Sequence, residues 1–564
     1  MKKHYETHVE DTDKLISVAG PELDYKSWYE QYRKLMEEQA QRKYGLYTPT
    51  SEGDDDDFPS IPGMIARYSA LGLTNEQMKE NPVWVDKTGN GHDLQMKNFL
   101  WGGMSGVGGY GDENHQTFYK FTLDDYVFIA SPPGAKHMNF TFRVTGLQPG
   151  NKLTLAFFGT TNTVYGTWNK DGIYTVDADI VEAGKPTYFY NGYGATRGEF
   201  TIEILPLYPG ALVFDGVDDY GVCDNFPILT KEKGYTVVAL RQWITYNPNA
   251  ISAIATNASD RSFNGVFTFE NYNKGAEQTI SYGATQITLQ YSKSPFSWQT
   301  TSKYNRVNIA NGNKDATNSL VLGRSYPQRN EFANFAIWEL VFLDHDATEE
   351  ELTKIKDYFV KTYPWLFPDQ AWTVVGKTNE DEDRATIANI TGNGNDLVLS
   401  NFGFAEGSGY NEEGEYAGYL VTDGVDDRIE SSSFTFNKDW TIVGNWTMLS
   451  NIPSNCGIVK ASSIFLYNSL DGVTIYFAGG PIKIQSKSIN AFCSDGRIYL
   501  NDWTEILKPD VQTVLDRISS LNIASYSDKF TKMAFKNLAI YDGKILSKED
   551  CIKAYNYLQT LKAK

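Results

Sequence analysis

Short stretches in which apolar and polar residues alternate recur along most of the chain. Alternation with a period of two predicts β-strands that bury one face. Turn sequences such as LQPGNK and NKDG separate the stretches. The pattern therefore predicts a mainly β protein built from sandwiches or barrels. Its strand-like stretches include TFYKFTL (117–123), NFTFRVTGL (139–147), KLTLAFFG (152–159), TYFYNG (187–192) and EFTIEIL (199–205).

The N-terminal 62 residues depart from this pattern. Ser27 and Glu30 match a capping box, and the residues after Ser27 predict one amphipathic helix. Its apolar positions at helical spacing are Trp28, Tyr29, Tyr32, Leu35 and Met36. The helix either packs on the domain that follows or docks the protein onto another subunit. The acidic segment SEGDDDDFPSIPG (51–63) then predicts a solvated linker.

A long repeat organises the rest of the chain. DKTGNGHDLQMKNF at 86–99 returns as NITGNGNDLVLSNF at 389–402, and ALVFDGVDDYGV at 211–222 returns as YLVTDGVDDRIE at 419–430. GLTNE (72–76) and GKTNE (376–380) precede the two copies. Each copy ends with a strand and a helix, and Thr348 and Ser547 are the predicted N-caps. The shared order of motifs indicates two copies of one domain.

The two copies differ in one spacing. Thr88 and Asp215 lie 127 residues apart, whereas Thr391 and Asp423 lie 32 apart. The additional 95 residues have the size of a small domain and contain the alternating stretches quoted above. Insertion at a surface loop is well tolerated, because domain termini usually lie close together. The predicted organisation is an arm and linker (1–62), a first sandwich (63–113 plus 210–367), an inserted β-sandwich (114–209) and a second sandwich (368–564).

The TGNG motif predicts structure rather than chemistry. Its Asn-Gly pair is typical of a tight type I′ hairpin turn, and Leu94 and Met96 then alternate with polar residues as in an edge strand. His92 suggests catalysis at first sight. The second copy has Asn395 at that place, however, and no Ser or Cys partner is patterned nearby. We therefore predict no catalytic role for this motif.

The DGVDD motif leaves two interpretations open. Its carboxylates could accept hydrogen bonds from backbone amides in Asx turns, or they could bind Ca²⁺. Ca²⁺ usually takes six or more oxygen ligands, and each motif offers only three acidic residues, so the turn is favoured. No other cofactor is expected. The acidic residues are Asp215, Asp218 and Asp219 in the first copy and Asp423, Asp426 and Asp427 in the second.

Charge and cysteine content narrow the class of protein. Asp and Glu (70) outnumber Lys and Arg (51), and the resulting net charge of −19 makes nucleic acid and membrane surfaces unfavourable partners. Four cysteines without a C-x-x-C pair predict free, mostly buried thiols. The N-terminal sequence lacks an apolar export signal, so we expect the chain to fold in a cytoplasm.

Enzyme fingerprints are absent from the sequence. It contains no nucleophile elbow, P-loop or dinucleotide motif, and no strand carries the flanking carboxylates of a glycosidase. Sugar binding needs less, namely an aromatic platform and a few amides. Four aromatic residues in Gly- and Asn-rich segments are candidate sugar ligands: Trp101, Tyr110, Trp168 and Tyr193.

Together, these motifs resemble the concanavalin A-like, laminin-G-type jelly roll, over 65–113 plus 210–367 and again over 370–564. The second copy departs from the pattern where Thr422 and Arg428 replace Phe214 and Tyr220. The wording GKTNEDEDRATIANITGNGNDL (376–397) is similar to virion proteins of phages that infect Bacteroidales, including crAss-like phages. The resemblance implies a two-sheet antiparallel fold that often binds glycans or proteins. It implies no general catalytic set and transfers no ligand residues.

We therefore expect a non-enzymatic bacteriophage virion protein, made in the host cytoplasm without a signal peptide and carried in the virion. Its N-terminal arm would bind other virion proteins in a multimeric assembly. Its sandwiches would attach to host-surface glycan as part of a tail or fibre. The alternative is a capsid or tail decoration protein whose sandwiches bind neighbouring subunits. A polysaccharide-degrading enzyme ranks lower.

Overall fold

The structure of the protein is a computed structural model. The structure describes residues 57–563 apart from these segments: 111–117, 122–125, 130–136, 158–162, 180, 182–186, 192–199, 230–233, 246–251, 259–267, 273–284, 292–294, 298–304, 309–315, 325–330, 413–415, 433–438, 450–456, 462–463, 470–471, 478–479, 485–488, 508–520, 524 and 527–528. The predicted N-terminal helix (Trp28, Tyr29, Tyr32, Leu35 and Met36) lies outside the described residues.

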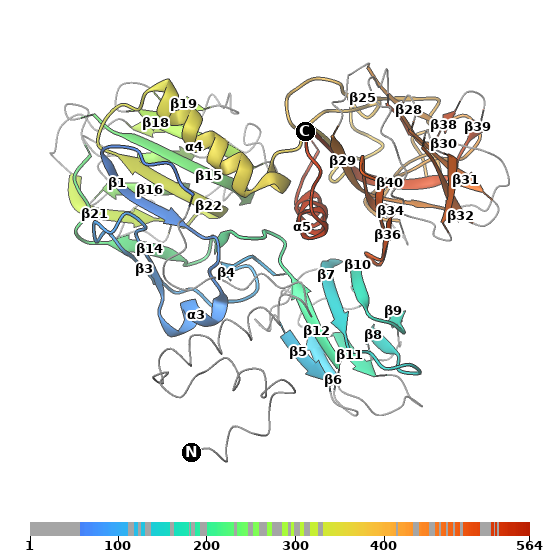
Figure 1. Cartoon of the computed structure of the whole chain (residues 1–564), viewed down its shortest axis with the longest axis horizontal. Coiled ribbons are helices and arrows are strands. Elements are labelled where there is room, and N and C mark those ends of the chain that lie inside the picture. The colour runs from blue at the N-terminus through green and yellow to red at the C-terminus, as the bar shows by residue number, and fades with distance from the viewer. Residues whose placement is uncertain are drawn as a thin grey trace, which may run out of the picture. The chain divides into compact units, whose positions relative to one another are not determined.

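The predicted fold class is confirmed, because the chain is mainly β with antiparallel sheets and few helices (Figure 1). Within the described residues, the first repeat forms two seven-stranded sheets. One has the order β19 (Pro295–Ser297), β18 (Gln286–Tyr291), β15 (Thr236–Thr245), β22 (Asn334–Leu343), β13 (Leu212–Asp215) and β4 (Gly106–Val107), with β1 (Met64–Ser69) also paired to β22. The other has the order β2 (Val83–Trp84), β3 (Leu94–Lys97), β14 (Tyr220–Cys223), β21 (Ala316–Leu322), β16 (Ser252–Ala258), β17 (Thr268–Tyr272) and β20 (Asn305–Asn308).

Strand β22 is buried on both faces, which explains its almost continuous apolar sequence. Phe335 and Phe342 point into the core between the two sheets. Trp338 and Val341 belong to a different cluster on the outer face. Helix α4 (Glu349–Thr362) covers this outer face and lies across β15 and β22 in Figure 1.

The residues between β4 and β13 form a separate sandwich, described as two four-stranded sheets. Their orders are β10 (Gly172–Asp179), β7 (His137–Thr145), β12 (Phe200–Leu205), β5 (Phe118–Phe121), and β6 (Tyr126–Ile129), β11 (Thr187–Asn191), β8 (Leu153–Phe157), β9 (Thr163–Trp168). Both sheets contribute to one core that contains Phe142, Leu155 and Phe189. Strands β4 and β13 pair with each other, Val107 opposite Leu212, so the chain leaves and re-enters the first sandwich at adjacent strands.

The second repeat is again described as two sheets around a core, with the same order of strands as the first in the middle of each sheet but with eight described strands in each sheet instead of seven. The first sheet runs β26 (Gly409–Asn411), β27 (Tyr419–Val421), β40 (Met533–Asp542), β29 (Trp440–Met448), β34 (Ile489–Cys493), β35 (Arg497–Leu500), β36 (Glu505–Leu507), with β23 (Gln370–Thr373) also on β40. The second runs β24 (Thr386–Ile387), β25 (Leu397–Ser400), β28 (Arg428–Ser431), β37 (Leu521–Ile523), β30 (Gly457–Ala461), β31 (Ile464–Ser469), β32 (Gly472–Phe477), β33 (Gly480–Ile484). Strands β38 (Ser525–Tyr526) and β39 (Lys529–Phe530) form a small ribbon.

Both predicted N-caps are confirmed. The Thr348 side chain accepts a hydrogen bond from the Glu351 amide and begins α4, and Ser547 does the same for Asp550 at α5 (Lys548–Gln559). The described helices are completed by α3 (Asn75–Glu80) and a 3-10 turn, η2 (Pro364–Leu366). No helix in the described part of the chain has the length and apolar character required to cross a membrane.

Helices α4 and α5 share one buried apolar cluster. It joins the outer face of the β15–β22 sheet, the 3-10 turn η2 and the outer face of the β29–β40 sheet. Phe58 and Ile61 also pack on this cluster, and the Phe58 ring lies 3.9 Å from the Arg67 guanidinium carbon. These two residues belong to the segment predicted as a solvated linker, so that prediction is wrong for its last part.

The predicted hairpin at TGNG is also wrong. Trp84 pairs with Leu94, so the connection between β2 and β3 comprises residues 85–93 rather than a two-residue turn. Positive φ angles fall on Gly89 (75°) and Gly91 (81°), the two neighbours of Asn90. The alternation in β3 is confirmed, because Leu94 and Met96 are buried and the residues between them are exposed. The edge position belongs to β2, one strand further out.

A buried carboxylate organises this loop instead. Asp86 is 4% exposed. Its Oδ1 accepts the amides of Arg67 (3.1 Å) and Thr88 (3.0 Å), and its Oδ2 accepts the amide of His92 (3.3 Å). In the second repeat Asn389 takes this place. Its Oδ1 accepts the amides of Ala371 (3.2 Å) and Thr391 (3.1 Å). The repeated sequence therefore encodes one loop scaffold around a buried acceptor.

Candidate functional site

A concave pocket of about 620 Å³ lies beside the TGNG loop of the first repeat. Its apolar lining comes from Met64 and Ile65 of β1 and from residues 227–229. Its polar side chains are Asn90, His92 and Asp344. An apolar wall with a few polar groups is the usual composition of a small-ligand site.

Each polar group of the pocket is held by the fold. The Asn90 side chain donates to the carbonyl oxygens of Met64 (3.1 Å) and Ile65 (2.9 Å). Asp344 follows β22, and its amide donates to the carbonyl of Gly63 (2.8 Å). A Cβ at Gly63, where φ is 72°, would lie 2.0 Å from a carboxylate oxygen of Asp344. The glycine therefore allows this carboxylate to approach the backbone.

His92 contributes an imidazole whose Nδ1 is buried and has no hydrogen-bond partner within the part of the chain that the structure describes. The ring packs edge-on against Phe226, with the centroids 5.4 Å apart. Because the His92 amide is held by Asp86, the loop scaffold fixes the position of this side chain. Because this nitrogen is buried, its hydrogen-bonding capacity is not available to a ligand in the open pocket.

Asp344 also interacts with a neighbouring histidine. Its Oδ1 lies 3.0 Å from Nδ1 of His345, and Nε2 of His345 lies 3.3 Å from Glu351 in the first turn of α4. Partial burial alone would lower the pKa of His345. The hydrogen bonds and charges of the two carboxylates outweigh burial and raise that pKa above its usual value.

Two polar residues of the pocket, His92 and Asp344, occur only in the first repeat. Asn395 stands at the place of His92. The Thr236 hydroxyl donates to the His345 carbonyl, and in the second repeat the Thr441 hydroxyl donates to the Lys544 carbonyl in the same way. Lys544 therefore corresponds to His345, and the residue before it, Gly543, corresponds to Asp344. Sequence reasoning set His92 aside as a turn residue and did not identify Asp344. A position-by-position comparison of the two repeats would have shown that the two residues differ together.

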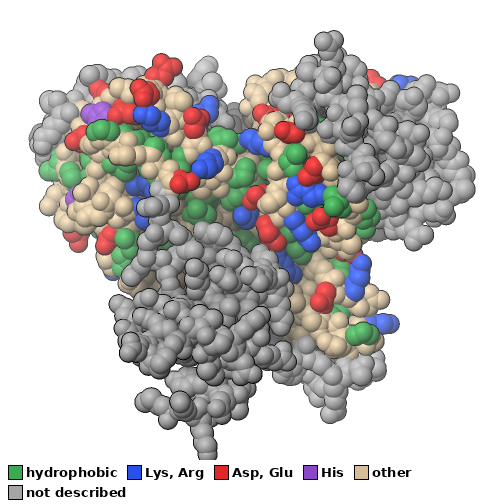
Figure 2. Space-filling model, viewed as in Figure 1, with side chains coloured by type: hydrophobic (Ala, Val, Ile, Leu, Met, Phe, Trp, Pro, Cys, Tyr) green, Lys and Arg blue, Asp and Glu red, His purple; other side chains and the backbone are tan. Residues whose placement is uncertain are grey.

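Figure 2 shows acidic and basic side chains interspersed over the described part of one face of the molecule. Such mixing gives the visible face no single-sign field of the kind that steers polyanions.

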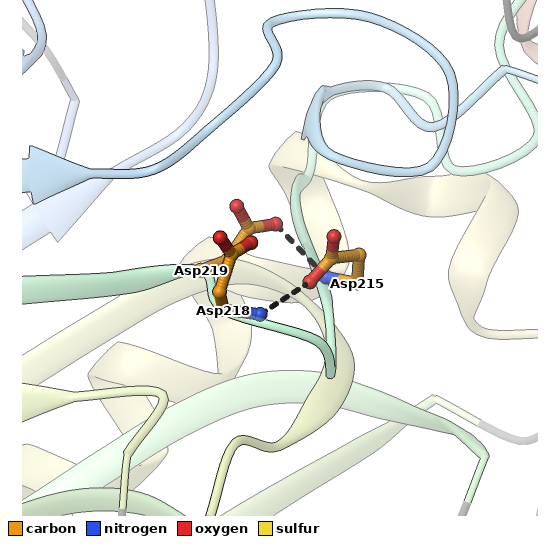
Figure 3. Close-up of side chains that lie close together, drawn as sticks. All are labelled: Asp215, Asp218 and Asp219. Atoms are coloured by element: carbon orange, nitrogen blue, oxygen red, sulfur yellow. Dashed lines mark hydrogen bonds between the residues drawn. The ribbon is translucent and has the colours of Figure 1, made fainter. Parts of the chain in front are cut away.

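The DGVDD motif of the first repeat forms a turn around its three carboxylates (Figure 3). Asp215 Oδ1 accepts the amides of Val217 (2.7 Å) and Asp218 (3.3 Å). Asp219 is fully buried, and its carboxylate accepts the Asp215 amide (3.0 Å) and the Ser105 hydroxyl (2.9 Å). These contacts are those of the Asx-turn interpretation.

The second motif repeats these contacts. Asp423 Oδ1 accepts the Val425 amide (2.7 Å), and Asp427 accepts the Asp423 amide (2.7 Å) and the Ser408 hydroxyl (3.0 Å). In both motifs one oxygen from each of the three carboxylates lies within 4.8 Å of the others. Ca²⁺ binding stays the less favoured of the two interpretations, and no observation tests it.

Burial perturbs the inner carboxylate of each turn. Burial and the charge of Asp215 raise the pKa of Asp219 to about 8, although its two hydrogen bonds act in the opposite direction. Burial raises the pKa of Asp427 to about 6. Protonation or a nearby cation would relieve the repulsion in such a cluster.

The predicted aromatic residues do not form one platform. Trp101 is 6% exposed in the core of the first sandwich and stacks on Phe99 with the centroids 4.7 Å apart, so little of its ring is available to a sugar. Tyr110 and Trp168 are partly buried and pack against the core of the inserted sandwich. Tyr193 lies outside the described residues.

Neither a protein-family model nor a curated protein matches the chain. Similar solved structures include a Trypanosoma rangeli sialidase in complex with sialic acid (9% identity, 78% of this chain and 83% of that chain covered, TM-score 0.24). They also include the binding domain of botulinum neurotoxin serotype D (11% identity, 60% and 88% covered, TM-score 0.21). A third is botulinum neurotoxin type C, from a study of two ganglioside molecules in its cell entry (8% identity, 88% and 96% covered, TM-score 0.22). At these TM-scores the similarities assign neither a fold family nor a function.

Proposed function

We propose that the chain is a non-enzymatic structural protein of a bacteriophage virion that attaches to a host-surface glycan as part of a tail or fibre. The pocket between the TGNG loop and β1 is the observation that carries the binding role. Its apolar wall suits the C–H face of a sugar, and Asn90, His92 and Asp344 offer polar groups to hydroxyls. The virion assignment rests on the resemblance of residues 376–397.

Direct binding to purified capsular polysaccharide of Bacteroides strains tests the glycan role. His92→Asn and Asp344→Asn are each expected to weaken binding by about tenfold, which corresponds to the loss of about 1.4 kcal/mol. Asn395→Ala, at the matching place of the second repeat, is the control and should bind as the wild type does. Equal affinity in all four proteins would refute the pocket as the site. Progressive shortening of the polysaccharide would refute the non-enzymatic role.

The alternative, a decoration protein that binds neighbouring subunits, is favoured by one observation. Val217 and Val425 occupy the same place in the two DGVDD turns and are 71% and 69% exposed. Apolar side chains at matching exposed tips are suited to a protein contact. If no polysaccharide binds and Val217→Ser with Val425→Ser reduces incorporation into particles, this alternative replaces the glycan role.

The arm can be tested separately. Because Phe58 and Ile61 pack on the α4 cluster, removal should end at residue 57. We expect the remaining sandwiches to stay folded, as judged by circular dichroism, and to be missing from purified particles. Normal incorporation of the truncated chain would refute an anchoring role.

A further inference from the structure

Two cysteines of the second repeat, Cys493 and Cys551, face each other across the contact between a strand and a helix. Cys493 ends β34, and Cys551 lies in the first turn of α5. Both are fully buried, and both belong to the cluster between α5 and the outer face of the β29–β40 sheet. The neighbour of Cys493, Phe492, belongs instead to the core of the sandwich. Strand alternation therefore directs Cys493 toward α5.

The hydroxyl of Thr441 holds the start of α5 next to Cys493. Thr441 pairs with Cys493 in the sheet, and its Oγ1 lies 3.6 Å from Cys493 Sγ. The same oxygen accepts the amide of Leu546, which directly precedes the N-cap Ser547 (2.9 Å). Cys551 then closes the first helical turn, since its amide donates to the Ser547 carbonyl (2.9 Å). The strand and the first turn of the helix are thereby held in register.

Both thiols belong to the buried cluster under α5, and Thr441 contacts both the Cys493 sulfur and the start of α5. Hydrogen bonding from Cys551 lowers the pKa of Cys493 against the effect of burial, and Arg497 acts in the same direction as Cys551. Burial raises the pKa of Cys551. One sulfur is thus prepared as the attacking thiolate and the other as the resolving thiol. The first repeat has Leu352 at the place of Cys551, four residues after its N-cap, so packing alone does not require a thiol here.

We propose that Cys493 and Cys551 are a redox pair that closes to a disulfide when the folded chain meets a low-molecular-weight disulfide, and that this bond ties α5 to β34. The Cys493 thiolate attacks one sulfur of the small disulfide, forms a mixed disulfide and releases one small thiolate. Cys551 loses its proton to solvent and attacks the Cys493 sulfur, which expels the second small thiolate. Two protein thiols are oxidised, and one small disulfide is reduced to two thiols.

Access to the pair requires the first turn of α5 to open, because both sulfurs are buried. Oxidation of the native chain is therefore slow, and urea below the unfolding midpoint accelerates it. The bond would close a loop from 493 to 551 and raise the denaturant midpoint of the second sandwich. A virion protein passes from a reducing cytoplasm to an oxidising exterior at lysis, although the chemistry of the pair does not depend on that role.

The test treats the full chain with oxidised glutathione, then unfolds it, counts its thiols and maps its peptides. We expect the count to fall from four to two, with the peptides of Cys493 and Cys551 joined. Cys223 donates to Asn225 elsewhere in the fold, so Cys223→Ser is the control and should cross-link as the wild type does. Cys551→Ala should instead retain one glutathione on Cys493. Four thiols after prolonged treatment in sub-denaturing urea, or a bond that involves Cys223 or Cys456, would overturn the proposal. The peptide map of the wild type gives this answer without any variant.

Discussion

Replacement of Asp86 tests whether the repeated loop is a scaffold around one buried acceptor. Asp86→Ala would remove the acceptor of three amides, those of Arg67, Thr88 and His92. A buried donor left without a partner costs about 1–3 kcal/mol. The amide of Arg67 lies on a buried strand, whereas Thr88 and His92 are half-buried and water can replace part of their loss. The expected cost to the loop is therefore roughly 3–5 kcal/mol.

Asp86→Asn is the informative comparison, because the second repeat uses Asn389 at this place. An amide oxygen can still accept from Arg67 and Thr88, and only the acceptor of the His92 amide is replaced by a donor group. We expect a cost of about 1–2 kcal/mol. The reciprocal change, Asn389→Asp, is the matched control in the second repeat.

Hydrogen exchange followed by mass spectrometry measures these costs locally, in peptides that cover 64–70 and 86–99. The expected order of protection is wild type, then Asp86→Asn, then Asp86→Ala. Peptides from the second repeat should exchange equally in all three proteins. The scaffold hypothesis is wrong if the Ala variant lies within about 0.5 kcal/mol of the wild type, or if the Asn and Ala variants are equally deprotected.

Three further predictions concern charge, contacts between sandwiches and glycine. Asp219 has a pKa of about 8 in the fold against 3.8 for an ordinary carboxyl, so the wild type should lose stability as pH rises from about 4 to 8. In calorimetry, the melting temperature of Asp219→Asn should depend less on pH than that of the wild type. The same pH dependence in both proteins would contradict this. Arg143 pairs with Glu549 of α5 at 3.1 Å and with Glu203 of its own sandwich at 2.8 Å, so Glu549→Ala isolates the contact between sandwiches. It should cost about 0.5–1 kcal/mol in urea unfolding, whereas an unchanged midpoint would show that solvent screens the pair. Gly106→Ala should lower the melting temperature more than Gly89→Ala. Both glycines have a positive φ, but only a Cβ at position 106 would lie 2.5 Å from an oxygen atom. Equal decreases in melting temperature would mean that backbone strain alone explains the cost of both substitutions.

Local signals in the sequence were sufficient for much of the fold. Alternation in β3 and the caps at Thr348 and Ser547 each depend on residues within four positions of one another, and the structure confirms them. The prediction of a hairpin at TGNG was wrong because contacts that are distant in sequence determine this loop. Asn-Gly has a strong local preference, but the buried acceptor Asp86 sets the loop by contacts that reach back to β1.

The candidate sites depended on contacts that are distant in sequence. His92 and Asp344 meet because β1 and β22 are paired, and a turn signal gives no indication of that pairing. Cys493 and Cys551 have no motif spacing, because a strand and a helix bring them together. Trp101 was judged by its Gly-rich neighbourhood, whereas the fold buries it against Phe99. The amino-acid composition of a loop is a poor guide to the exposure of its side chains where the loop turns back into the core.

The pairing of β4 with β13 has an evolutionary consequence. In the second repeat the corresponding strands β26 and β27 pair in the same way and are joined only by residues 412–418. The first repeat carries an entire sandwich at the place of this short connection. Neighbouring antiparallel strands are about 5 Å apart, so any module whose own ends lie together can occupy the junction without a change in either sheet. Recombination at this point would exchange the module while preserving the parent domain, and one chain preserves both the filled and the empty form of the junction.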